Sequence, residues 1–119
     1  MLENNPGLAR QEVRFELDEA QRKLDNIGTL SGRYLSLATL GDTRSPLGHQ
    51  VPGLCHNILV CKDLLIGYEE RHGGTMTFAD LRRMDPSVHK VFCQAIQQVR
   101  SFDREIQYQI ACEKLGRKP

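Results

Sequence analysis

The chain has 119 residues, enough to close one hydrophobic core and too few for a separate catalytic domain, so we expect a single helical-bundle domain over residues 1–119. Hydrophobic residues make up 39% of the chain and charged residues 26%, which is typical of a globular protein and excludes a disordered or membrane-embedded chain. The formal net charge is +1, so no overall field attracts nucleic acid or anionic lipid.

The first residues predict a cytoplasmic protein. Residues 1–6 lack the basic start and apolar stretch of a secretory signal, and no apolar run approaches the ~20 residues of a membrane span. We therefore expect no membrane contact. In that compartment cysteines stay reduced, so we expect buried free thiols rather than disulfides. The cysteines are Cys55, Cys61, Cys93 and Cys112.

A first helix is predicted over residues 6–40. Asn5 followed by Pro6 is a good helix opening, because Asn caps free amide groups and Pro needs no amide partner there. Apolar residues then recur at alternating spacings of four and three, which is a heptad stripe. The stripe is Val13, Leu17, Ala20, Leu24 and Ile27. Gly28 and Gly32 leave open whether this helix runs on or breaks.

Residues 41–52 are rich in Pro and Gly and predict a loop, followed by a second helix over 53–72. This helix has the same stripe, in Leu54, Ile58, Cys61, Leu65 and Tyr68. It also carries a second apolar strip nearly opposite the first, formed by Cys55, Leu59 and Ile66. We therefore expect it to be covered on two faces, as the buried centre of the bundle.

The last part of the chain predicts a short helix over 78–84 and a long one over 86–116. Thr77 and Asp80 have the spacing of a capping box, and Asp85-Pro86 opens the long helix, which Gly116 should end. Its stripe is Val88, Phe92, Ala95, Val99, Phe102 and Ile106. With no strand pattern, the fold class is all-α, an antiparallel bundle of three long helices and a short fourth.

Residues 77–92 resemble a helix-turn-helix, which sets a second helix into the major groove of DNA. The resemblance covers about 20 residues and departs from the pattern at Leu81, where a small residue is usual, and at Asp85, where Gly is usual. The cationic residues that it would use are Arg82, Arg83 and Lys90.

A second nucleic-acid pattern is an Arg followed four to six residues later by His, which resembles a family of helical-bundle ribonucleases. Arg44 with His49 fits, and so does Arg83 with His89. The resemblance implies that such a pair would sit at the phosphate. Because about one match is expected by chance in this composition, we treat nucleic-acid action as the alternative, not the favoured function.

Metal and nucleophile chemistry are not predicted. Glu69 and His72 have the spacing of di-iron ligands, but the second Glu-x-x-His that such a site needs is missing. No Cys-x-x-Cys pair occurs, and Cys55 and His56 are adjacent on a helix, where side chains diverge. We expect neither metal nor cofactor.

Some apolar residues lie off the main stripes and indicate a partner surface. They are Leu8, Phe15, Tyr108, Cys112 and Leu115. We interpret the chain as a small non-enzymatic interaction or regulatory protein that acts through protein–protein contacts. The partner's identity is open. A first helix of about 52 Å would project beyond the monomer core, so we also expect a homodimer.

Overall fold

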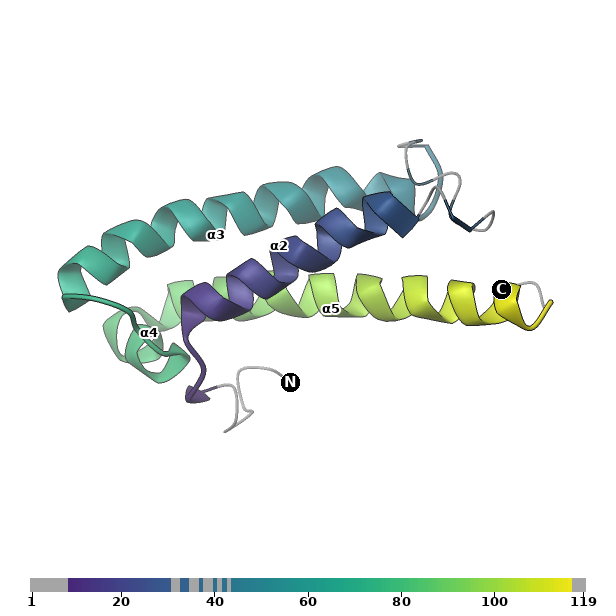
Figure 1. The fold of residues 1–119 in the computed structure, drawn as a ribbon. Helices are drawn as coiled ribbons and strands as arrows, with labels where there is room; N and C mark the ends of the chain where they lie inside the picture. Colours follow the sequence, from purple (N-terminus) through teal and green to yellow (C-terminus); the bar gives the residue numbers. More distant parts are fainter. Residues whose placement is uncertain are drawn as a thin grey trace.

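In the computed structural model, the backbone is described over residues 9–30, 33, 34, 37, 40, 42 and 44–116. This part of the chain is built of α-helices joined by turns and short 3-10 segments, among them η3. The elements are α2 (Val13–Leu30), η3 (Gly48–Gln50), α3 (Val51–His72), α4 (Phe78–Met84) and α5 (Pro86–Lys114). The predicted all-α helical bundle is thereby confirmed (Figure 1).

The three longer helices alternate in direction. Asn57 of α3 lies beside Gln98 of α5, whereas Tyr68, further along α3, reaches Asp85 at the beginning of α5, so the two helices run in opposite directions. α2 lies across both in Figure 1 and is tied to both by ion pairs. These pairs are Arg14–Glu69, Lys62–Asp18 and Arg100–Glu16.

The apolar stripes of α2, α3 and α5 meet in one hydrophobic core. Every stripe residue predicted above is buried except Val88, which is half-buried at the start of α5. The segment from Met76 through α4 closes this core at one end, since Met76, Phe78 and Leu81 are almost inaccessible to solvent. Burial of each such large side chain stabilises the fold by about 1.5–3 kcal/mol.

The connection from α3 through α4 to α5 follows the sequence signals. Gly73 ends α3 with a left-handed φ of 93°, a conformation that favours glycine. Thr77 and Asp80 form the predicted capping box, with each side chain accepting from the other residue's amide. Asp85 then ends α4 and caps α5 by accepting from the amide of Val88 at 3.2 Å.

The first helix does not run continuously over 6–40: of the two outcomes that Gly28 and Gly32 left open, the break is the one observed. α2 begins at Val13 and ends at Leu30, and Arg33 and Tyr34 are not helical. Leu37 and Leu40 are buried in the core, so the chain turns back after α2 instead of continuing along its axis. Gly28 lies within α2, and Gly32 lies outside the described residues. With 18 residues, α2 is about 27 Å long, half of the expected 52 Å.

The expectation that α3 is the buried centre is also wrong. Only its main stripe is buried, while Leu59 and Ile66 of the second strip are 56% and 53% exposed. Within the described residues, α3 contacts α2 and α5 on one side, and no element covers its outer side. Hydrophobic periodicity showed that this strip is apolar, but it could not show which element would cover it.

Candidate interaction surface

The apolar residues predicted to form a partner surface do not gather in one place. Phe15 lies beside Ile96 and Val99 of α5, whereas Tyr108 is nine to twelve residues further along that helix, about 14–18 Å away. Phe15, Tyr108 and Leu115 are exposed as expected, and Leu8 lies outside the described residues. The exposed members therefore form separate spots on the bundle.

Cys112 is not exposed, which corrects its assignment to that surface. Only 7% of the residue is accessible to solvent. The hydroxyl of Tyr108, one helical turn earlier, contacts the thiol, and this hydrogen bond raises the pKa of Tyr108. Helical periodicity places Cys112 on the back of α5 but does not reveal that neighbouring side chains cover it.

The candidate nucleic-acid residues separate into two groups at opposite ends of α3. Arg44 and His49 precede α3, whereas Arg82, Arg83 and Lys90 follow it, on α4 and the start of α5 (Figure 1). The side chain of Arg44 is 90% exposed and pairs with Asp42 at 3.1 Å, which lowers the pKa of that carboxyl group. An arginine so exposed does not line a cleft that could enclose a phosphate.

The structure also does not match the other two nucleic-acid patterns, the pair Arg83 and His89 and the helix-turn-helix resemblance over residues 77–92. His89 is buried against Phe78, and the guanidinium of Arg83 is paired with Asp80. One residue, Asp85, separates α4 from α5, whereas the motif uses a turn of three or four. Phe92 and the following stripe of α5 are buried in the bundle, so most of this helix cannot enter a DNA groove.

The four cysteines are free thiols, as predicted, and Cys55 is half-buried while the other three are buried. Burial raises the pKa of the Cys61 thiol to about 11, so this group is protonated at neutral pH and is a poor nucleophile. Within the described part of the chain, no three His, Cys, Asp or Glu side chains are placed to hold a metal ion.

The surface that the sequence prediction missed is the outer side of α3. Leu59, Val60, Leu64 and Ile66 are large apolar residues that are between 39% and 56% exposed. On a helix they form two strips, with Leu59 and Ile66 toward α2, and Val60 and Leu64 toward the side away from α2. Contiguous exposed apolar side chains of this kind are typical of interaction sites.

The second strip borders a groove between α3 and α5. The groove encloses about 770 Å³ and has Leu54 and Phe102 among its apolar lining residues. Its polar lining is mostly uncharged, and Asn57 donates to Gln98 across it at 3.2 Å. The polar lining residues are Gln50, Asn57, Gln97, Gln98, Ser101, Glu105 and Gln109. We call Val60, Leu64 and this groove the α3–α5 furrow.

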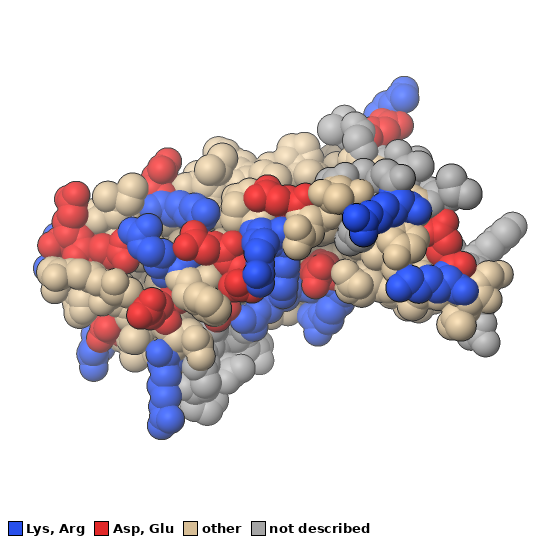
Figure 2. Space-filling model, viewed as in Figure 1, with Lys and Arg blue, Asp and Glu red and all other residues tan. Residues whose placement is uncertain are grey.

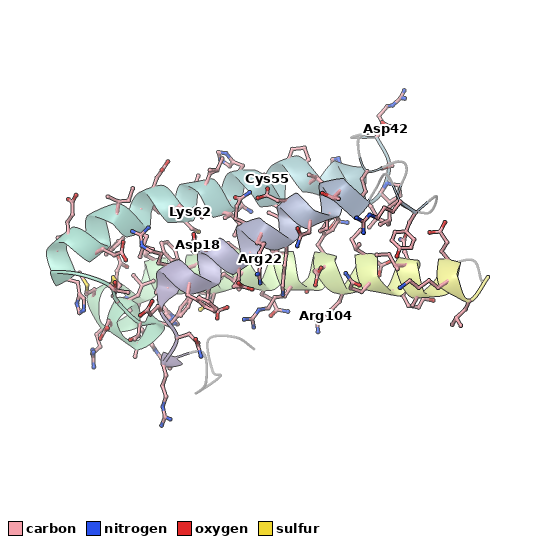
Figure 3. All side chains as sticks on the ribbon, viewed as in Figure 1. Asp18, Arg22, Asp42, Cys55, Lys62 and Arg104 are labelled. Atoms are coloured by element: carbon pink, nitrogen blue, oxygen red, sulfur yellow. The ribbon has the colours of Figure 1, made fainter. Side chains whose placement is uncertain are left out.

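Charge is scarce along the furrow. Residues 51–61 of α3 contain no Asp, Glu, Lys or Arg, and neither do residues 91–99 of α5. On the face that includes α2, by contrast, acidic and basic side chains are interspersed (Figure 2). In Figure 3, Lys62 and Asp18 point toward one another where α3 meets α2, and they pair at 3.3 Å. Because interface cores are depleted in charge, the furrow resembles an interface more than the α2 face does.

No described helix has the length and apolar composition needed to cross a membrane. Comparison with protein-family models, with curated proteins and with solved structures finds no match to the chain.

Proposed function

We propose that this chain is a non-enzymatic interaction protein with a regulatory role, which acts through protein–protein contacts and forms a homodimer. The observation that carries the proposal is the exposure of Val60 and Leu64 beside a groove in whose lining Glu105 is the one charged residue among those described. Covering the exposed part of either side chain would contribute about 1 kcal/mol to association.

The expected homodimer was based on the length of the first helix. An 18-residue α2 does not project beyond the other helices, so helix length no longer supports self-association. The α3–α5 furrow supports it instead, because a twofold axis buries the same patch on both copies at once. A groove between two helices also accepts a third helix through apolar contacts one turn apart.

Light scattering coupled to size exclusion tests this proposal. At micromolar concentration we expect twice the chain mass of 13.5 kDa. The variants Val60→Gln and Leu64→Gln should shift the protein toward monomer, because they place an amide where an apolar contact forms. Both positions are exposed in the monomer, so helix content measured by circular dichroism should not change.

Leu115→Gln is the matched control, because Leu115 is 70% exposed but lies at the end of α5. This variant should remain dimeric. A wild-type monomer at every concentration would contradict the homodimer. A dimer that tolerates both furrow substitutions and dissociates with Leu115→Gln would place the interface at the end of α5.

A further inference from the structure

The outer side of α3 carries a heptad stripe that the core does not use. Its positions alternate in spacing by four and three along one side of the helix, facing away from α2. They are Gly53, Asn57, Val60, Leu64, Gly67 and Arg71. The large apolar residues lie at the centre and the glycines toward the ends. We call these six residues the outer seam.

The glycines of the outer seam are not required by close packing among the described residues. A Cβ atom added to Gly53 or Gly67 would meet no other atom within 4 Å. Glycine inside a helix is about 1 kcal/mol less favourable than alanine. Glycine does, however, allow another backbone to approach closely. Together with Val60 and Leu64, the glycines therefore indicate that a second helix packs on this seam.

We propose that the helix in the α3–α5 furrow is α3 of a second copy, packed antiparallel about a twofold axis between Val60 and Leu64. The inference rests on the proposed homodimer and specifies its geometry. In this register Val60 faces the partner's Leu64, and Asn57 faces the partner's Gly67. The apolar residues therefore meet at the centre, and each glycine lies opposite a larger side chain. The resulting core has α3 and α5 from each copy, the arrangement of a four-helix bundle.

Charge complementarity selects the antiparallel direction. Arg71 ends the outer seam near the C-terminus of α3, and its guanidinium lies 4.3 Å above the ring of Tyr68. Glu105 lines the groove at the other end, together with Gly53. Antiparallel packing brings the partner's Arg71 to Gly53 and therefore to Glu105, twice per dimer. Parallel packing would instead place the two Arg71 side chains beside one another.

A charge-swap experiment tests this geometry. Arg71→Glu or Glu105→Arg alone turns both intermolecular pairs into like-charge contacts, so each should weaken dimerisation about tenfold at low salt. The double variant restores opposite charges and should return the dissociation constant to within a few fold of wild type. Sedimentation velocity over a dilution series measures these constants. Both residues are exposed, so the variants should fold.

Arg104→Glu is the control, because it makes the same change of charge on an exposed residue of α5 that does not line the groove (Figure 3). This variant should dimerise like wild type. A dimer that is insensitive to both single reversals, or a double variant as weak as the singles, would overturn the antiparallel geometry while leaving the homodimer in place. A monomeric wild type would instead refute the proposed function itself.

Discussion

Gly48 lies where the chain folds tightly back on itself before α3. The hydroxyl of Ser45 donates to the carbonyl of Asp42 at 2.9 Å and accepts from the amide of Gly48 at 3.0 Å. A Cβ atom on Gly48 would collide with the Asp42 carbonyl oxygen and would lie 2.9 Å from that of Leu40. These neighbours are backbone atoms, which cannot swing aside as a long side chain can.

Gly48→Ala should therefore lower the free energy of unfolding by about 1–3 kcal/mol, the usual cost of overpacking. Urea denaturation followed by circular dichroism measures the change. Gly53→Ala, compared at a concentration low enough for the protein to be monomeric, is the matched control, because a methyl group there meets open space within the chain. If the free energy of unfolding falls equally in the two variants, the close contacts at Gly48 do not determine the effect of the substitution.

At Gly48 the sequence predicted that the chain turns but not that the backbone is crowded there. The density of Pro and Gly over 41–52 predicted a loop correctly in the described positions up to Leu47, although η3 spans Gly48–Gln50 and α3 begins at Val51. Local composition indicates that a turn forms, but the crowding at Gly48 depends on the path by which the carbonyls of Leu40 and Asp42 return to it. That path follows from packing and not from residue preference.

Among the secondary-structure elements, α3, α4 and α5 are linked through one residue, Asp85. Its carboxylate accepts from the Tyr68 hydroxyl of α3 at 2.7 Å and from the amide of Val88 in the first turn of α5. Asp85 is also the residue that ends α4. The Tyr68 hydroxyl, followed by the Val88 amide, lowers the pKa of this carboxyl group. The charged form is therefore favoured in the folded protein.

Asp85→Ala should lower the free energy of unfolding by about 1–2 kcal/mol, because α5 loses its cap and Tyr68 loses its acceptor. Asp85→Asn should lose less, since asparagine also caps helices. A carboxyl group with a lowered pKa stabilises the fold above its ordinary value near 3.8 and loses that contribution as the pH falls through its folded value.

The stability difference between wild type and Asp85→Asn should therefore be greatest near neutral pH and shrink below pH 4. Urea denaturation at a series of pH values measures it. Asp25→Asn, on the exposed side of α2, is the control and should show a much smaller difference. A difference that is constant across this range would contradict the role of the Asp85 charge.

The helices were predicted well where burial follows local periodicity and poorly where it depends on distant contacts. The core stripes of α2, α3 and α5 could be read from heptad spacing alone. The end of α2 could not be predicted in this way. Leu37 and Leu40 keep helical spacing in the sequence, yet they are buried in the core although they lie beyond the end of α2. Similarly, Leu59 and Ile66 were recognised as an apolar strip and were expected to be covered by another helix of the bundle. No element of the described chain covers them.

At the scale of the whole molecule, the bundle is elongated, with extents of 50 × 25 × 19 Å. Helices α3 and α5, which line the furrow, run along the long axis (Figure 1). Tyr108 lies in the C-terminal part of α5, and Leu115 follows the end of that helix. A dimer that uses the furrow therefore places two bundles side by side. A dimer that uses the C-terminal end of α5 places them end to end, so molecular shape distinguishes the two surfaces.

Small-angle X-ray scattering of the dimer should report the side-by-side shape. Adding a second bundle across the furrow raises the radius of gyration from the 16.0 Å of one chain to about 20 Å. Because the twofold axis lies off the middle of α5, the longest dimension grows from 50 Å to about 65 Å. End-to-end association would give about 30 Å and nearly twice the length. The Leu64→Gln variant should scatter as a single chain and supplies the reference curve. A dimer of nearly twice the length of one chain would exclude the furrow as the interface, because two copies joined along α3 overlap over most of their length.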